Sequence, residues 1–219
     1  MSNLTLVIGN KNYSSWSLRP WLAMRHAGIP FDERLLRLFD GQWKEAITAV
    51  SPSGRVPVLL HGERTVWETL AILEYVNELF PDAGLWPSDR DARAQARAVA
   101  NEMHAGFITL RTHMPMNLRR RDLKGMGRAP GVDADIARVC EIWRDCRARW
   151  GAGGDFLFGA FSAADAMFAP VATRLDTYGI DLDETCTAYS RAVLSLPAFT
   201  EWREAALKEP WIVPEDEID

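Results

Sequence analysis

The residues best suited to chemistry are the hydroxyls of Ser14, Ser15 and Ser17, close to an expected helix start. Residues 4–8 are apolar and end in a polar turn, which predicts a buried strand followed by a loop. Apolar residues at helical spacing then run to Gly28, with Pro30 beyond, which predicts a helix. Free amide hydrogens and the positive end of the helix dipole favour an anion at such a start: a phosphate, a carboxylate or a thiolate. Ser15 or Ser17 could equally be a plain helix cap.

Pro20 limits where this helix can begin. Proline lacks an amide hydrogen and is tolerated best in the first turn, so we place the start near Ser15 to Ser17.

Composition excludes several classes of function. The chain has 219 residues and 47% hydrophobic content, enough for one large or two small globular domains. Its net charge of −5 is spread along the sequence, and the basic run at residues 119–121 is too short to predict nucleic-acid binding. No apolar run is long enough for a membrane span, and the N-terminus does not resemble a signal peptide, so we expect no membrane partner and a cytoplasmic protein.

The cysteines and histidines fit a cytoplasmic protein without a metal site. Cys140, Cys146 and Cys186 form no Cys-x-x-Cys pair, which suits a reducing compartment and buried packing roles. The four histidines lack metal-ligand spacing, so we predict no metal site.

The pattern of expected secondary structure changes near residue 80, from alternating strands and helices to helices alone. Strands are expected at residues 4–8, 34–38, 56–60 and 65–67, and helices near residues 15–27, 43–50 and 70–79, giving the order βαβαββα. Residues 81–91 are a plausible linker. Beyond them we expect long helices at residues 92–114 and 134–150, an apolar helix at 162–178 and a last helix from Pro197 to Lys208. The change marks a domain boundary.

Four segments, in order, resemble the glutathione S-transferase family. Residues 55–59 (Arg-Val-Pro-Val-Leu) resemble the Val-Pro element of thioredoxin-like folds, and residues 67–75 resemble the Glu/Gln-Ser-x-Ala-Ile segment. Residues 162–165 resemble the family's Ser/Thr-x-x-Asp capping box. Residues 13–19 resemble the Ser-Ser-Cys-x-x-Arg segment of zeta-class members, with Trp16 in place of the cysteine.

This resemblance implies an α/β plus all-α fold. A thioredoxin-like glutathione-binding domain would span residues 1–80, a linker 81–91, and an all-helical bundle domain 92–219. It also implies a cis peptide bond before Pro57 and a homodimer.

The resemblance assigns most of a glutathione site. Thr69 and its amide would hold the γ-glutamyl carboxylate, and Glu68 the ligand's amino group. Val56, before Pro57, would offer its backbone to the cysteinyl residue. Further contacts would come from Gln42, Arg19 and Arg55, with Lys44 as an alternative to Arg55 at the glycyl carboxylate.

The thiol would be the reacting group. A free thiol of pKa about 8.5 is mostly protonated at neutral pH, whereas the thiolate is the nucleophile. Lowering that pKa by about two units needs roughly 2.7 kcal/mol, within reach of a hydroxyl hydrogen bond and a helix terminus. Ser14 is the first candidate for the donor and Ser15 the second.

The second substrate would meet the sulfur between the two halves. Tyr13, Ile108, Arg111 and Thr112 are its candidate wall, with Met114 and Met116 as adaptable apolar surface. The implied activity is transfer of glutathione to a small hydrophobic electrophile. A glutathione-dependent isomerase of the maleylacetoacetate type and a non-catalytic binding or regulatory protein remain open alternatives.

Overall fold

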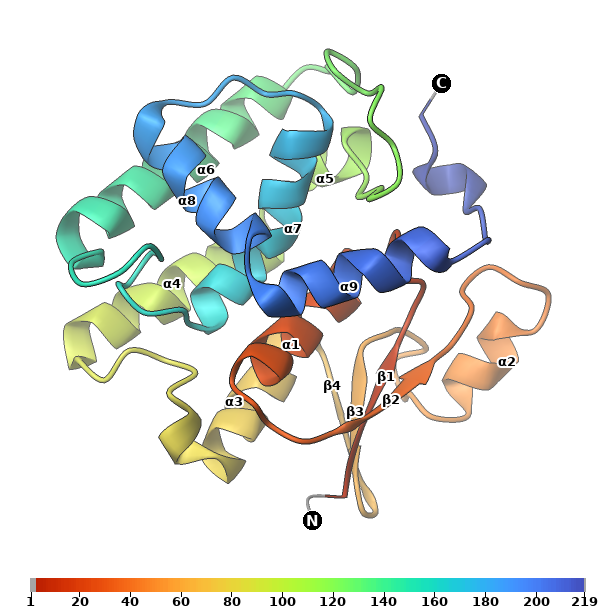
Figure 1. Cartoon of the computed structure of the whole chain (residues 1–219). Coiled ribbons are helices and arrows are strands. Elements are labelled where there is room, and N and C mark those ends of the chain that lie inside the picture. Colours follow the sequence, from red (N-terminus) through yellow and green to blue (C-terminus); the bar gives the residue numbers. More distant parts are fainter. Residues whose placement is uncertain (1–2, 219) are drawn as a thin grey trace.

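The computed structural model describes residues 3–218 (Figure 1). Its first part contains β1 (Leu4–Ile8), α1 (Ser15–His26), β2 (Asp32–Leu35), α2 (Trp43–Thr48), β3 (Val58–His61), β4 (Arg64–Trp67) and α3 (Thr69–Leu79). This confirms the predicted order βαβαββα.

The four strands form one mixed sheet of order β2-β1-β3-β4. β1 pairs parallel with β2, Thr5 opposite Asp32, and antiparallel with β3, Leu6 opposite Leu59. β4 closes the sheet as an antiparallel hairpin with β3. The peptide bond between Val56 and Pro57 is cis, as the resemblance implied.

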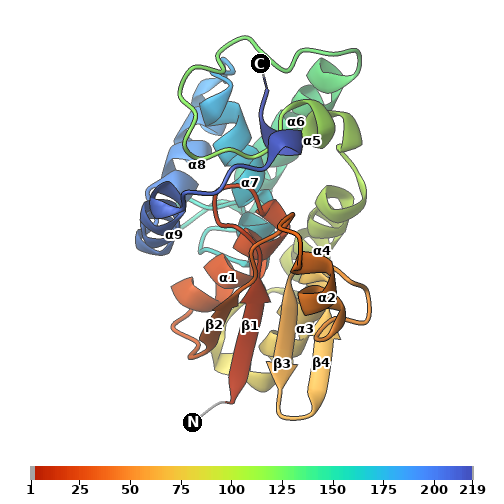
Figure 2. The same ribbon diagram turned by 90° about the vertical axis from the view of Figure 1, so that its right-hand side faces the viewer.

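The second part is helical. It contains α4 (Arg90–Ala105), α5 (Ile108–His113), α6 (Val132–Trp150), α7 (Ala163–Thr177), α8 (Glu184–Leu194) and α9 (Pro197–Lys208), with short 3₁₀ turns at η1 (Pro81–Ala83) and η2 (Pro214–Asp216). In Figure 2 the sheet lies below, and α5 to α8 lie above it. The fold is therefore a thioredoxin-like domain followed by a helical domain.

Two predictions for the helical part were wrong. The single helix expected over residues 92–114 is two helices, because the chain turns at Gly106 and at Phe107, whose φ is 56°. A left-handed residue cannot continue an α-helix. Helix α8 was not predicted; its N-cap Asp183 accepts a hydrogen bond from the amide of Cys186.

Pro20 also departs from its prediction. Helix α1 begins at Ser15 as expected, but Pro20 lies inside it rather than in its first turn. The carbonyl of Trp16 therefore has no amide four residues later to bond to, and it accepts the Thr69 hydroxyl at 3.2 Å instead. The proline thus provides a polar link between α1 and α3.

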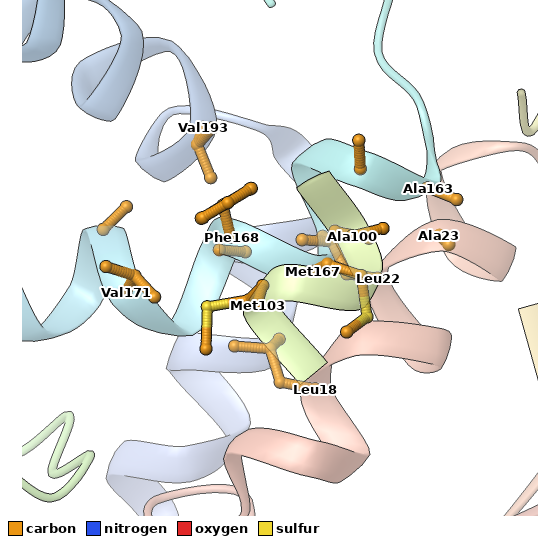
Figure 3. Packing of buried hydrophobic residues seen from close by; sticks show 14 of the residues in the cluster. Leu18, Leu22, Ala23, Ala100, Met103, Ala163, Met167, Phe168, Val171 and Val193 are labelled. Carbon is orange, nitrogen blue, oxygen red and sulfur yellow. The ribbon is translucent and has the colours of Figure 1, made fainter. Parts of the chain in front are cut away.

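The main core joins both parts of the chain. Leu18, Leu22 and Ala23 of α1 pack with Met167 and Phe168 of α7, all fully buried (Figure 3). Ala100 and Met103 of α4 complete this layer. Because α1 packs on α7, the helix that begins at the serines is fixed by the helical domain.

A buried carboxylate organises the start of α7. Asp165 accepts hydrogen bonds from the amides of Leu157 (3.0 Å) and Ser162 (2.8 Å) and from the Ser162 hydroxyl (2.9 Å). With the Ser162 cap, these contacts form a capping box. Burial raises the pKa of Asp165 to about 6, although the hydrogen bonds oppose that change.

We predict that Asp165→Ala lowers the free energy of unfolding by about 3 kcal/mol, because three buried donors lose their acceptor. Urea unfolding of the two proteins measures the difference. Asp183→Ala is the matched control: it removes one exposed cap together with the exposed ion pair to Arg144, and should cost about 1 kcal/mol. Equal losses in the two variants would contradict this role for Asp165.

Candidate functional site

The loop between β1 and α1 is held by a carboxylate from the far end of the chain. Glu209 accepts hydrogen bonds from the amides of Lys11 (2.7 Å) and Asn12 (3.1 Å). Its side chain is almost fully buried, and burial raises its pKa. The Trp202 indole of α9 donates to the Lys11 carbonyl at 3.0 Å. The helical domain therefore determines where the loop before α1 lies.

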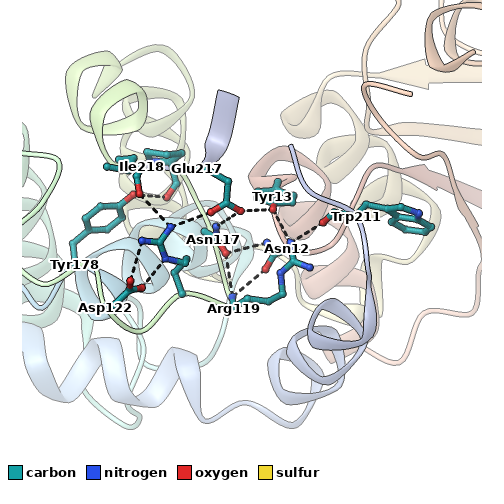
Figure 4. Close-up of polar contacts among 11 residues, drawn as sticks. Asn12, Tyr13, Asn117, Arg119, Asp122, Tyr178, Trp211, Glu217 and Ile218 are labelled. Atoms are coloured by element: carbon teal, nitrogen blue, oxygen red, sulfur yellow. Dashed lines mark hydrogen bonds and ion pairs between the residues drawn. The ribbon is translucent and has the colours of Figure 1, made fainter. Parts of the chain in front are cut away.

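A polar network continues from this loop to the C-terminal segment (Figure 4). The Asn12 amide group donates to Asn117 at 3.0 Å. Arg119 donates to the Tyr13 hydroxyl at 2.6 Å, and that hydroxyl donates to Glu217 at 2.5 Å. Burial and the bond to Glu217 raise the pKa of Tyr13. The Tyr13 hydroxyl proton is thus held in the hydrogen bond to Glu217.

The two candidate serines differ in what their hydroxyls contact. Ser14, the N-cap residue of α1, is buried and donates to the Ser17 hydroxyl at 2.7 Å; Ser17 in turn accepts the Gly9 amide at 3.0 Å. Ser15, the first residue of α1, is half-buried and accepts from Arg174 at 3.4 Å. Ser15 therefore keeps its own proton for another acceptor.

Trp16 contacts two guanidinium groups. Arg19 lies 4.2 Å and Arg111 5.1 Å from the indole centroid, both as cation–π contacts. His104 approaches the indole edge-on at 5.2 Å. The indole is held on several sides and forms a fixed wall at the start of α1.

Arg174 places a second cation at the serines. It is buried and donates to the carbonyls of Met114 (2.7 Å) and Pro170 (3.1 Å). Burial and the nearby charge of Arg111 lower its pKa to about 10, so it stays charged at neutral pH. Within residues 3–218, neither Arg174 nor Arg111 forms an ion pair with a carboxylate, although Asp216 lies within electrostatic range of Arg174 and Asp135 within that of Arg111.

Two adjoining cavities meet at Trp16. The smaller, of about 270 Å³, is lined by Trp16, Ser53, Arg55, Val56, Pro57, Glu68, Thr69, His104 and Arg111. The larger, of about 490 Å³, shares Trp16, Arg55, Val56 and Arg111 with it. Its other lining residues are Asn10, Tyr13, Ser14, Ser15, Leu38, Phe39, Trp43, Gly54, Thr112, Met116, Arg174, Val213 and Asp216.

Family models match both domains. Residues 13–79 match the glutathione S-transferase N-terminal domain, and residues 118–205 match the C-terminal domain. The chain belongs to the glutathione S-transferase family. The matched ranges contain the serines, the cis Pro57 and Arg174.

Individual relatives agree with this assignment. A probable maleylacetoacetate isomerase of Caenorhabditis elegans is 24% identical over 204 residues, covering 91% of this chain and 93% of that protein. A maleylpyruvate isomerase of Ralstonia is 30% identical over 139 residues, or 61% of this chain and 62% of the relative. A Burkholderia glutathione transferase homologue solved with bound glutathione superposes with a TM-score of 0.69 at 21% identity, covering 94% and 98% of the two chains.

Most site residues expected of a glutathione S-transferase line these cavities. The smaller cavity brings together Glu68, Thr69 and Pro57, and the larger one Ser14, Ser15, Tyr13 and Thr112. Arg55, Val56 and Arg111 line both.

Four residues expected at the site line neither cavity. Arg19 is fully buried behind Trp16, bonded to the carbonyls of Met167 and Ser15, and lines neither cavity. Gln42 is exposed at the start of α2, where its amide bonds to Asp40. Ile108 is 63% exposed and also lies outside both cavities, as does Lys44. In each case a sequence position near the site did not establish the direction of the side chain.

Three titratable residues that line these cavities were not identified from the sequence: His104, Arg174 and Asp216. Arg174 could have been noticed, because a cation inside the otherwise apolar segment 163–177 is unusual. His104 and Asp216 lie in ordinary polar stretches, where no local pattern separates a cavity residue from a solvated one.

Within residues 3–218, no three His, Cys, Asp or Glu side chains are grouped as a metal site would require. No helix in the same range has both the length and the apolar character needed to cross a membrane.

We predict that Glu209→Gln lowers the free energy of unfolding by roughly 1–3 kcal/mol, since an amide cannot accept both backbone hydrogens. The amides of Lys11 and Asn12 should then exchange with deuterium faster, as NMR would show. Glu204→Gln, an exposed change on the same helix, is the control and should alter neither quantity. Unchanged exchange in Glu209→Gln would contradict the proposed hold on the loop.

Proposed function

We propose that this protein is a glutathione-dependent transferase. The observation that carries the proposal is the junction of two cavities at the start of α1, where Ser15 and the buried Arg174 cation lie together. One cavity has the groups that a tripeptide requires. The other offers room for an electrophile within reach of the same serine.

The smaller cavity suits the peptide part of glutathione. Thr69 begins α3, so its amide can bind the γ-glutamyl carboxylate, while its hydroxyl stays bonded to Trp16. Glu68 can take the amino group. Its φ of 69° is strained for a residue with a side chain, and such strain is concentrated at functional sites.

The middle and the glycyl end of glutathione fit the residues around the cis bond. Val56 can pair its backbone with the cysteinyl residue, as an added strand would. Arg55, exposed at the edge of both cavities, can neutralise the glycyl carboxylate. The cysteinyl sulfur would then point toward the start of α1.

Ser15 is the better candidate for the thiolate donor. Its hydroxyl proton is free to face the sulfur, whereas the Ser14 proton is directed to Ser17. The Arg174 guanidinium beside Ser15 adds a positive charge at the same point, and the α1 terminus adds its dipole. All three interactions favour the thiolate over the thiol.

Calorimetry with glutathione tests the proposal directly. We expect binding at or below millimolar concentration, and turnover with at least one member of a panel of small electrophiles. No binding would exclude a glutathione site. Binding without turnover across the panel would instead support a non-catalytic binding or regulatory role.

We predict that Ser15→Ala raises the pKa of bound glutathione by about 1–2 units, because one hydrogen bond to the thiolate is lost. Thiolate absorbance, followed against pH in the binary complex, measures the change. Ser14→Ala is the matched variant and should move this pKa less. The reverse order would assign the role to Ser14.

A glutathione-dependent isomerase is the second candidate. The larger cavity holds Arg111 and Arg174 without an ion-pair partner within residues 3–218, which suits a substrate bearing carboxylates. The relatives named maleylacetoacetate and maleylpyruvate isomerases act on molecules of that kind. Isomerisation would return glutathione unchanged, whereas transfer would consume it.

We predict that Arg111→Gln raises KM for maleylpyruvate about tenfold or more, because one charged hydrogen bond to a carboxylate is lost. Activity toward an uncharged electrophile is measured alongside and should fall much less. Chromatography for free glutathione distinguishes isomerisation from transfer. An equal loss for both substrates would show that Arg111 supports the site rather than an anion.

Several broader expectations also remain proposals. We propose a homodimer and a cytoplasmic location, supported by the family resemblance. We also propose that the chain divides into a first domain at residues 1–80, a linker at 81–91 and a second domain at 92–219.

A further inference from the structure

The C-terminal turn forms one wall of the larger cavity. Val213, just before the η2 turn, and Asp216, its last residue, both line it with Tyr13 and Arg174. This segment is far in sequence from every motif of the glutathione site. It nevertheless lies where an electrophile would be held.

The turn is fixed by several hydrogen bonds (Figure 4). Glu217 accepts from the Tyr13 hydroxyl (2.5 Å), Asn117 (2.9 Å) and Arg120 (3.1 Å). The Ile218 carbonyl accepts a further bond from Arg120 at 3.1 Å. Asp216, directly before Glu217, therefore has a defined position in the cavity wall.

Asp216 is the one acidic side chain among the described residues that line the larger cavity. Arg174, which lines the same cavity, and Tyr178 are within electrostatic range of it, and Glu215 and Glu217 are its neighbours in sequence. Burial raises its pKa to about 6, and the two glutamates add to this effect while Arg174 opposes it. Such a group can hold and release a proton near neutral pH.

Three hydroxyl groups of this cavity, on Tyr13, Ser14 and Ser15, direct their protons to other acceptors. The Tyr13 proton is bonded to Glu217, and burial raises the Tyr13 pKa further. Ser14 donates to Ser17. Under the proposed function, the Ser15 proton faces the sulfur. Asp216 is left as the acid that an electrophile could use.

We propose that Asp216 is a catalytic residue, the general acid that protonates the electrophile when glutathione adds to a carbon–carbon double bond conjugated to a carbonyl. The proposal rests on the proposed function, because it requires glutathione in the adjoining cavity. It names a substrate class for the same site: conjugate acceptors, whose addition products need a proton.

The thiolate sulfur forms a bond to the β-carbon, and the π electrons move toward the carbonyl, giving an enolate. The Asp216 carboxyl transfers its proton to the α-carbon, and the resulting carboxylate takes a proton from water. The thiol had already lost its own proton to solvent, so the sum is addition of glutathione across the double bond.

Two probe reactions test the role. Addition to 4-phenylbut-3-en-2-one needs this proton, whereas substitution on 1-chloro-2,4-dinitrobenzene releases chloride and needs none. We predict that Asp216→Asn lowers the ratio of addition to substitution rates by roughly tenfold to a hundredfold. General damage to the cavity slows both reactions, so it leaves the ratio of their rates unchanged. Glu215→Gln, on the same turn but outside the cavity, is the control and should keep the ratio.

The pH profile gives a second readout. A required acid of pKa about 6 makes kcat/KM for addition fall as the pH rises above that value, and Asp216→Asn should abolish this fall. An unchanged ratio, or no enone addition by a wild-type protein that binds glutathione, would overturn the role of Asp216. Failure to bind glutathione in calorimetry would instead overturn the proposed function.

Discussion

The hydrogen bonds from the Lys11 and Asn12 amides to Glu209 are the constraint on which the site depends. They join the loop after β1 to a carboxylate almost two hundred residues away in sequence. A buried carboxylate needs such donors, and a loop with free amides needs such an acceptor, so each stabilises the other. Because this loop leads into α1, the same contact fixes Ser14 and Ser15 relative to the helical domain. The packing of α1 on α7 then brings Arg174 to Ser15.

Buried guanidinium groups are costly, and this site contains two of them. Arg19 and Arg174 are bonded mainly to backbone carbonyls, and one Arg19 nitrogen has no acceptor within residues 3–218. Burial holds the pKa of Arg19 well below its ordinary range, and the charge of Arg174 acts in the same direction. An unpaired buried cation lowers stability, so its presence beside a cavity is better explained by an anion that binds there than by folding.

Local patterns allowed much of the fold to be predicted, and most of the residues expected at the site line the two cavities. The strand at residues 4–8, the hairpin and the start of α1 were confirmed, because apolar periodicity and turn residues act over short distances. Arg19 lies outside both cavities, since sequence gives the position of a residue on a helix but not which neighbours will cover it. His104, Arg174 and Asp216 enter the site only through tertiary packing. A motif confined to the first domain therefore cannot show how the second domain completes the cavity.

Trp16 shows how a single difference from the zeta-class pattern changes the electrostatics around it. A cysteine at this position would offer a second nucleophile, whereas the indole offers none. Its π faces instead attract the Arg19 and Arg111 guanidiniums, at 4.2 Å and 5.1 Å from its centroid. Both positive charges therefore lie close to the indole at the start of α1. Position 16 has become a support for positive charge, which favours a thiolate supplied by a ligand over one supplied by the protein.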